Sequence, residues 1–303
     1  MAKYSLSNKT VFITGAAGGI GAASARALHA RGANLVLTGR NASSLDDLAR
    51  ELGEKRSLSL PVDVTDRAAL QNAVAHTVDR FGTLDIVFAN AAIGPDLPAT
   101  IATIDPELFE RIIEVNLLGV WRTVRAALPQ IIANRGHVLV TSSTYAYING
   151  AVNAPYAASK AAIEQFARAL RIELAMHGAT AGVLYPGWVR TQMSRPALGG
   201  HELTTRMREV AFPSPLATAI SPQVVARRAV QGIERRAPRI TVPRRWQPVG
   251  ILRGIVNPLS DRLLSRHAKL QLLLLALEDA ARTGATRHAQ TIAKPVASKT
   301  VSS

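Results

Sequence analysis

The sequence predicts an α/β fold in which a doubly wound parallel sheet forms a single domain and a C-terminal helical extension follows it. Short continuous apolar runs alternate with longer helical patterns over the first 243 residues, and a glycine-rich turn follows the first run. Continuous apolar runs are typical of parallel strands that helices cover on both faces. A chain of 303 residues could form one large domain or two small ones, and the even alternation favours one.

The predicted elements follow one another regularly along the chain. The apolar runs that predict strands are residues 11–14, 35–38, 85–89, 137–141, 180–185 and 239–242. The helical patterns are residues 20–32, 44–52, 66–81, 106–133, 156–177 and 222–236. We therefore expect a core domain over residues 1–243 and a helical extension over residues 244–282. Residues 283–303 have few large apolar side chains and are expected to form a flexible tail.

A glycine-rich turn joins the first predicted strand to the first predicted helix. Its pattern is T-G-x-x-x-G-x-G, from Thr14 through Gly15 and Gly19 to Gly21. Glycines permit a tight turn and a close approach of the backbone, and the helix that follows offers unpaired N–H groups. The turn therefore predicts a loop that cradles phosphates, although its spacing differs from the common G-x-G-x-x-G pattern.

The second predicted strand ends in Gly39 and Arg40. A carboxylate at this strand end would bind the ribose hydroxyls of NAD and would repel a phosphate. Arginine instead matches a phosphate dianion with two parallel hydrogen bonds. The position favours NADP(H) over NAD(H), and the alternative is a surface arginine that is compatible with either cofactor.

The helical pattern over residues 156–177 carries the strongest indication of chemistry. Tyr156 and Lys160 are four residues apart, so their side chains share one helix face, and Ser143 lies thirteen residues before the tyrosine. Lowering the pKa of a phenol by two to three units costs roughly 3–4 kcal/mol. One ammonium at about 4 Å supplies roughly 4 kcal/mol at an effective dielectric near 20. The pair is therefore expected to act as a general acid and base.

These motifs resemble those of the single-domain short-chain dehydrogenase/reductases, from about Lys9 to about Pro243. The resemblance implies a Rossmann-type sheet. Ala89 and Ala92 depart from the first and last positions of the family's Asn-Asn-Ala-Gly segment. Many NADP-using relatives have a basic residue at the position of Gly18, and this chain does not. The matching segments are the glycine turn, Asp63-Val64, Asn90-Ala91-Ala92, Asn116, Ser143, Tyr156-Ala157-Ala158-Ser159-Lys160 and Pro186-Gly187-Trp188-Val189-Arg190-Thr191.

The resemblance also implies roles for these residues. Tyr156 exchanges a proton with the substrate oxygen, and Ser143 hydrogen-bonds that oxygen. Lys160 lowers the pKa of the phenol and holds the ribose of the nicotinamide. Asn116 holds a water beside Lys160, and its alternative is a structural residue inside a helix. The implied cofactor-binding residues are Gly15, Gly19, Ile20, Gly21, Arg40, Asp63, Val64, Asn90, Tyr156, Lys160, Pro186, Gly187, Val189 and Thr191.

Ser142, Tyr145 and Tyr147 carry the same hydroxyl groups as Ser143 and Tyr156 and lie close to them in the sequence. Ser142 adjoins Ser143, and only the thirteen-residue spacing selects the latter. Tyr145 and Tyr147 have no lysine four residues later, so we expect them to line the substrate pocket.

We therefore expect an oxidoreductase that prefers NADP(H) and interconverts a secondary alcohol with a ketone or aldehyde. Residues 192–220 are rich in proline, glycine and apolar side chains, and in the family this insertion forms a lid over the substrate. That composition favours a hydrophobic small-molecule substrate. Two other functions remain open: a nucleotide-binding sensor or scaffold without efficient turnover, and a membrane-surface reductase of lipid carbonyls.

Composition excludes several other classes of protein. There is no cysteine, so neither a disulfide framework nor a cysteine metal site can form, and the seven histidines are not spaced as metal ligands. The net charge of +15 is typical of nucleic-acid binders, but the cations are scattered and lack an aromatic stacking platform. We therefore predict no metal and no nucleic acid.

The N-terminus is polar and no apolar run reaches the roughly eighteen residues of a spanning helix. We therefore expect a cytoplasmic protein that at most associates with a membrane surface. Residues 246–277 form a basic amphipathic pattern that can lie in a membrane interface. They can also pack on the body or cap a neighbouring subunit, and the resemblance implies a homodimer or homotetramer.

Overall fold

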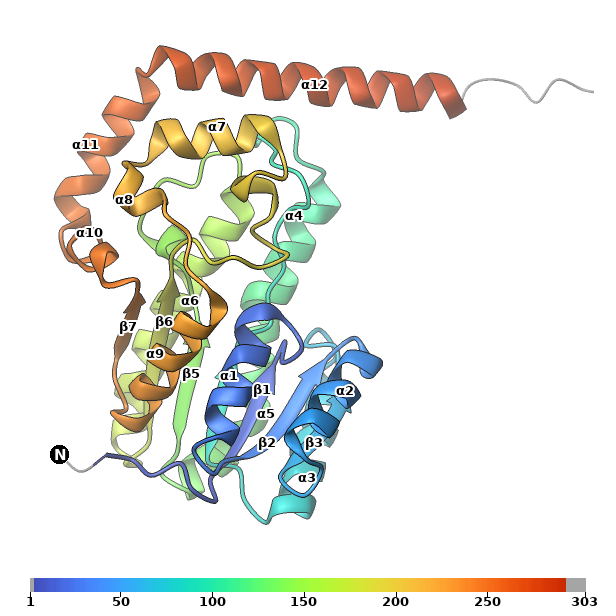
Figure 1. The fold of residues 1–303 in the computed structure, drawn as a ribbon, viewed down its shortest axis with the longest axis vertical. Helices are drawn as coiled ribbons and strands as arrows, with labels where there is room; N and C mark the ends of the chain where they lie inside the picture. The colour runs from blue at the N-terminus through green and yellow to red at the C-terminus, as the bar shows by residue number, and fades with distance from the viewer. Residues whose placement is uncertain (1–2, 293–303) are drawn as a thin grey trace, which may run out of the picture.

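The computed structural model describes residues 3–292 and contains a seven-stranded parallel sheet (Figure 1). The strand order is β3-β2-β1-β4-β5-β6-β7. The sequence patterns miss β3, because two serines interrupt its apolar residues. The strands are β1 (Thr10–Thr14), β2 (Asn34–Gly39), β3 (Ser57–Pro61), β4 (Ile86–Ala89), β5 (His137–Thr141), β6 (Thr180–Pro186) and β7 (Arg239–Val242).

Helices cover both faces of this sheet (Figure 1). One face packs on α1 (Gly19–His29), α2 (Ala42–Leu52) and α9 (Pro222–Glu234). The other face packs on α3 (Arg67–Phe81), α5 (Gly119–Ala133) and α6 (Ala154–Ala175). The side chains of β1 show why its pattern is continuous: Val11 and Ile13 pack on the first face and Phe12 on the second, and all three are fully buried. The predicted α/β fold class is confirmed.

The predicted helix over residues 106–133 is interrupted. It begins as α4 (Pro106–Ile113), widens into a π-helical turn over Glu114–Leu118, and continues as α5. Such turns insert one residue into a helix and often occur at functional sites. Asn116 lies in this turn and is fully buried.

The strand order of the sheet reverses direction between β1 and β4, and this point determines where a ligand can bind. The strand order runs in one direction from β1 to β3 and in the other from β4 to β7. At such a switch point the loops after the two central strands diverge and leave a crevice at the carboxyl ends of the strands. Gly15 follows β1 and Asn90 follows β4, so both lie at this crevice.

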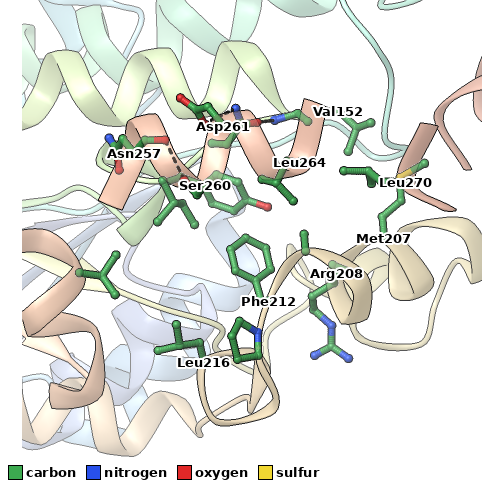
Figure 2. A pocket seen from close by; sticks show the side chains of 18 of the residues that line it. Val152, Met207, Arg208, Phe212, Leu216, Asn257, Ser260, Asp261, Leu264 and Leu270 are labelled. Carbon is green, nitrogen blue, oxygen red and sulfur yellow. Dashed lines mark hydrogen bonds between the residues drawn. The ribbon is translucent and has the colours of Figure 1, made fainter. Parts of the chain in front are cut away.

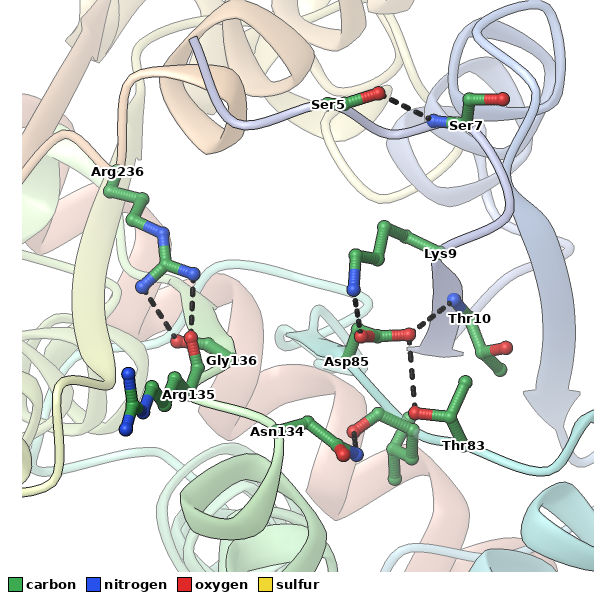
Figure 3. A network of polar contacts seen from close by, with 11 residues as sticks. Ser5, Ser7, Lys9, Thr10, Thr83, Asp85, Asn134, Arg135, Gly136 and Arg236 are labelled. Atoms are coloured by element: carbon green, nitrogen blue, oxygen red, sulfur yellow. Dashed lines mark hydrogen bonds and ion pairs between the residues drawn. The ribbon is translucent and has the colours of Figure 1, made fainter. Parts of the chain in front are cut away.

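A polar network closes the opposite end of the sheet (Figure 3). The buried Asp85 carboxylate accepts hydrogen bonds from the Lys9 ammonium and the Thr10 backbone N–H. The Arg236 guanidinium donates to the backbone carbonyls of Arg135 and Gly136. These contacts satisfy backbone and charged groups at the amino ends of the strands, so we assign them a structural role.

The lid and the C-terminal extension lie together above the carboxyl end of the sheet (Figure 1). We call residues 192–220 the lid and residues 244–282 the arm. The lid contains a 3-10 turn (Pro196–Leu198), α7 (Glu202–Ala211) and α8 (Ser214–Ala217). The arm contains a 3-10 turn (Arg244–Trp246), α10 (Gln247–Ile251), α11 (Arg253–Ser265) and the first part of α12 (Ala268–Ile292). Helix α12 packs on α7 through a small apolar cluster formed by Met207, Leu270, Leu273 and Leu277.

Helix α12 is longer than the sequence analysis predicts. It includes residues 283–292, which the sequence pattern assigns to a flexible tail, and residues 293–303 lie outside the described part of the chain. No helix in residues 3–292 is long and apolar enough to cross a membrane.

A buried ion pair attaches the arm to the core. One guanidinium nitrogen of Arg253 in α11 lies 3.0 and 2.9 Å from the two carboxylate oxygens of Glu164 in α6. Glu164 is 3% exposed, and its other cation, Arg239, is 3.8 Å away. Trp246, which is 1% exposed, fixes the start of the arm beside the sheet.

Arg253→Ala is expected to lower the free energy of unfolding by about 2 kcal/mol, because it leaves a buried carboxylate without its nearest hydrogen-bond donor. Urea unfolding measures the change. The control is Arg206→Ala, which removes a solvent-exposed pair with Glu202 and should cost roughly 0–1 kcal/mol. Equal effects of the two substitutions would show that the buried pair does not stabilise the arm.

Candidate active site

The crevice at the switch point contains a cavity of about 580 Å³, which we call the glycine-loop cavity. It collects residues from both halves of the chain. Twelve of the predicted cofactor-binding residues line it: Gly15, Gly19, Ile20, Gly21, Arg40, Asn90, Tyr156, Lys160, Pro186, Gly187, Val189 and Thr191.

The glycine turn is shaped as a cradle without room for side chains. Gly15 has φ +65°, and a Cβ there would lie 2.9 Å from the Ala91 Cα. A Cβ at Gly21 would lie 2.1 Å from the Gly15 carbonyl oxygen. Helix α1 begins at Gly19 with no side-chain cap, so its first N–H groups are free to bind an anion. These features fit the pyrophosphate of a dinucleotide.

Asn90 fixes the relative position of three strands at the cavity floor. Its amide nitrogen lies 3.2 Å from the Thr14 carbonyl oxygen after β1. Its amide oxygen accepts a hydrogen bond from the Thr141 hydroxyl at the end of β5, 3.1 Å away. The backbone N–H groups of Asn90 and Ala91 both donate to the Thr14 hydroxyl. The asparagine therefore holds the loop that forms this wall of the cavity.

The structure does not bring Asp63 and Val64 into the lining of the cavity. Asp63 accepts hydrogen bonds from the backbone and hydroxyl of Thr65. Burial of its carboxyl is outweighed by these bonds and by the charge of Arg40, so the pKa of Asp63 is lowered. Asp63 is therefore close enough to Arg40 for the two charges to attract each other. The predicted contact of Asp63 and Val64 with adenine stays a prediction.

Ser143 and Tyr156 meet at the edge of the glycine-loop cavity. Ser143 follows β5 and is 6% exposed, and Tyr156 lies in the first turn of α6. Ser142 points elsewhere: its hydroxyl donates to the Lys160 carbonyl oxygen at 2.7 Å. The catalytic role of Ser143, which the thirteen-residue spacing favours over Ser142, stays a prediction.

Burial dominates the pKa of the Tyr156 phenol, and the predicted lowering of that pKa by Lys160 stays a prediction. Burial raises the pKa of Tyr156 to about 12, and a hydrogen bond with Ser143 only partly opposes this rise. The Lys160 ammonium donates to the Thr141 carbonyl oxygen at 2.9 Å and lies 5.4 Å from the centre of the Tyr156 ring. Burial also lowers the pKa of Lys160 to about 7. Helix spacing places both groups at the same cavity, and burial disfavours the charged form of each.

This burial predicts a pH-dependent cost to stability. As pH falls from about 10.5 to about 7, an unfolded lysine takes up a proton that the folded Lys160 resists, so unfolding becomes progressively easier. Lys160→Met removes this cost. Without nucleotide, the variant should gain stability relative to the wild type as pH falls from 9.5 to 7, as measured by urea unfolding at each pH.

Lys269→Met is the matched control, because Lys269 is exposed on α12. Its stability relative to the wild type should not change with pH. A constant difference between Lys160→Met and the wild type over the same range would contradict the inferred burial cost.

Asn116 contacts the loop after β4 rather than Lys160. Its amide oxygen accepts from the Ile93 backbone N–H at 2.8 Å, and its amide nitrogen donates to the Ile93 carbonyl and the Ser159 hydroxyl. The π-helical turn aims it toward this loop. Its predicted role in holding a water stays a prediction, and its hydrogen bonds join the loop after β4 to Ser159 of α6.

Sequence reasoning missed two residues beside Arg40. Asn41 caps α2 by accepting from the Ser44 backbone N–H at 3.1 Å, and both line the cavity. Asparagine immediately before a helical pattern is the signal that could have located this helix start.

Two further cavities extend from Tyr156 toward the arm. The middle cavity, of about 130 Å³, shares Ser143, Tyr156, Gly187 and Val189 with the glycine-loop cavity. The arm cavity, of about 420 Å³, lies between lid and arm (Figure 2). The middle and arm cavities share five lining residues: Tyr145, Val152, Trp188, Ala197 and Thr204.

Aromatic rings connect these cavities. Neighbouring ring centres are 5.8–6.0 Å apart, and the rings meet edge to face or tilted, as aromatic pairs prefer. The series begins at Tyr156 and runs through Tyr145, Trp188 and Phe212 to Trp246. It provides a continuous apolar wall from the phenol to the arm.

The geometry agrees with the comparison with known protein families. A family model described as short chain dehydrogenase matches residues 9–199, which is more than half of the chain. The chain belongs to the short-chain dehydrogenase/reductase family. In this short-chain dehydrogenase/reductase, the family model covers only the first part of the lid and none of the arm.

Several relatives share the matched region. A bovine protein named dehydrogenase/reductase SDR family member 7B is 35% identical over 200 residues, which cover 63% of this chain and 61% of the relative. Momilactone A synthase of Oryza sativa subsp. japonica is 35% identical over 195 residues, which cover 64% of this chain and 71% of the relative. The match with the bovine protein thus spans less than two thirds of that protein's length.

Of two solved structures with the same fold, one is complexed with NADH and the other with an NADP derivative. A 3-ketoacyl-(acyl-carrier-protein) reductase from Brucella melitensis, complexed with NADH, has a TM-score of 0.69 and 27% identity over 78% of this chain and 98% of its own. An alcohol dehydrogenase from Thermococcus sibiricus, complexed with 5-hydroxy-NADP, has a TM-score of 0.65 and 29% identity over 77% of this chain and 95% of its own.

Proposed function

We propose that this protein is an NADP(H)-preferring oxidoreductase that interconverts a hydrophobic secondary alcohol with its ketone or aldehyde. The observation that carries the proposal is the position of Ser143 and Tyr156, which line both the glycine-loop cavity and the middle cavity. A cofactor in the first and a substrate in the second would meet at these two side chains.

When bound, the nicotinamide supplies or accepts a hydride at the substrate carbon. In reduction, the Tyr156 hydroxyl donates a proton to the carbonyl oxygen, and the Ser143 hydroxyl orients that oxygen and stabilises its developing charge. Burial raises the pKa of Tyr156, so the phenol is neutral at pH 7 and can serve as the proton donor when the carbonyl is reduced. Lys160 lies against the tyrosine ring, where it can hold the ribose and return a proton.

The apolar wall supports a hydrophobic substrate. Beyond the phenol, the substrate would meet aromatic rings and the aliphatic side chains of the lid and arm, such as Met207, Leu216 and Leu264. Burying such a substrate gains about 25 cal/mol for each Å² of apolar surface. We also propose that the protein assembles as a homodimer or homotetramer, which sedimentation measures.

Preference for NADP(H) is supported by the end of the cavity beside β2. Arg40, Asn41 and Ser44 line it there, and no acidic side chain is among the described residues that line the cavity. A guanidinium with a hydroxyl and an amide nearby suits a phosphate group rather than two ribose hydroxyls.

Arg40→Asp is expected to weaken NADPH binding about ten- to a hundredfold and to weaken NADH binding much less, because a charge-assisted hydrogen bond is lost and a repulsive charge is added. Isothermal titration with both nucleotides measures the ratio. Arg50→Asp, an exposed change farther along α2, is the control and should leave the ratio unchanged. An unaltered ratio in Arg40→Asp would contradict the role of Arg40.

The function is tested by titration of the protein with NADPH and NADH, followed by a panel of ketones and aldehydes monitored at the nicotinamide absorbance. Tight NADPH binding with turnover of bulky apolar ketones would support the proposal. Binding without turnover of any carbonyl compound would favour a nucleotide-binding sensor or scaffold. Failure to bind either nucleotide would refute the proposed function.

A further inference from the structure

Helix α11 has one side that lines the arm cavity and another side that is apolar and exposed. Its inner side lines the arm cavity with Val256, Asn257, Ser260 and Leu264 (Figure 2). Its outer side carries Ile255, Leu259 and Leu263, which are spaced four residues apart and are 65%, 59% and 71% exposed. Ile251 and Leu252, just before the helix, are 73% and 51% exposed. We call these five exposed residues the outer stripe.

Cations without acidic partners border the outer stripe. Arg262 and Arg266 lie three residues after Leu259 and Leu263, so each flanks the stripe on the helix surface. Within the described residues, no carboxylate pairs with Arg262, Arg266 or Lys269, and all three are exposed. An apolar stripe with flanking cations is complementary to a lipid surface that combines acyl chains with anionic headgroups.

One exposed edge of the arm cavity lies at the junction of α11 and α12, next to the stripe. Asp261, Ser265 and Gln271 line the cavity and are also exposed at the junction of α11 and α12. Each of the first two is one residue away from a flanking arginine. A surface that covers the stripe would therefore lie next to this exposed edge of the cavity.

A second copy of the chain fits this surface less well. Two copies that meet at the stripe would bring their exposed Arg262 and Arg266 side chains together. A stable protein interface also takes roughly 20–30 residues on each side, which far exceeds the five of the stripe.

We propose that the outer stripe docks on an anionic lipid bilayer and places the exposed edge of the arm cavity against the membrane. A lipid-phase alcohol or carbonyl compound then enters the arm cavity along the inner side of α11 without crossing water. The docking itself rests only on the arm, whereas delivery of a substrate rests on the proposed function.

Vesicle flotation tests the docking with the full chain. The wild type should float with phosphatidylcholine vesicles that contain phosphatidylserine, float less with phosphatidylcholine alone, and be released by high salt. Ile255→Glu/Leu259→Glu/Leu263→Glu should lower the partition coefficient by at least about tenfold, since three apolar side chains no longer enter the interface. Thermal melting checks that the variant is folded, which the exposure of all three residues favours.

Ile172→Glu/Met176→Glu provides the control, because these residues are 76% and 83% exposed at the end of α6, away from the arm. It should float as the wild type does. The docking is refuted by a wild type that does not float with anionic vesicles or by a stripe variant that floats equally well. It is also refuted if sedimentation shows that the stripe variant loses a wild-type oligomer while neither protein binds vesicles.

Titration with NADPH in the same samples separates this inference from the proposed function. Nucleotide binding without flotation refutes the docking and leaves the oxidoreductase assignment intact. Flotation without nucleotide binding supports the docking and refutes the oxidoreductase assignment.

Discussion

Tyr156→Phe is expected to lower turnover by about 10²–10⁴-fold and to leave NADPH affinity unchanged. The substitution removes the only group at this position that can exchange a proton with the substrate oxygen. It keeps the ring, and therefore the edge-to-face contact with Tyr145 at 5.9 Å and the ring contact with Lys160. Titration with NADPH and single-turnover reduction of a ketone measure the two quantities separately.

The control is Tyr145→Phe, which changes the same chemical group one ring away. Burial raises the pKa of Tyr145 as well, so that phenol is also neutral near pH 7. It lines the middle cavity without lining the glycine-loop cavity, so its loss should affect substrate affinity more than the chemical step. Near wild-type turnover in Tyr156→Phe would exclude the phenol as the general acid.

Gly21→Ala is expected to weaken nucleotide binding by at least about ten- to a hundredfold. The added Cβ would lie 2.1 Å from the Gly15 carbonyl oxygen, which belongs to the backbone of the cradle and cannot rotate away. Overlaps of this kind typically cost 1–3 kcal/mol, and here the loop that would bind pyrophosphate has to move. Titration with NADPH measures the loss, and thermal melting shows how much of the cost falls on folding.

Gly18→Ala in the same turn is the control. Its Cβ would lie 3.3 Å from the same Gly15 oxygen, so a shift of a few tenths of an ångström relieves the contact. If both substitutions weakened binding equally, the overlap could not be the cause. Wild-type affinity in Gly21→Ala would contradict the assignment of the turn as the phosphate cradle.

Sequence patterns located most of the fold because the central strands are buried on two faces. β1, β4 and β5 are continuous apolar runs that need no partner to be recognised. The sequence patterns do not predict β3, because Ser57 and Ser59 interrupt its apolar residues. Only its pairing with β2 defines this strand. The π-helical turn around Asn116 also escaped, since a single inserted residue does not disturb helix composition.

Site residues were predictable where a motif fixes backbone geometry. The glycine turn and the Tyr156–Lys160 spacing follow from local conformation, and twelve predicted residues do line one cavity. The ionisation of the pair was not predictable. Spacing gives the distance between two groups on a helix, but the pKa values depend on how much of the surrounding core excludes water.

By itself, then, the sequence determined the fold class and the glycine turn, and it predicted an acid–base role for Tyr156 and Lys160, because these depend on local conformation and on periodic burial. Tertiary structure decided which surfaces the arm covers. Residues 246–277 show one amphipathic pattern in the sequence, whereas in the structure α11 has a cavity-lining side and an exposed apolar side. That division depends on the buried Arg253–Glu164 pair and on packing against α7, which join segments far apart in the chain.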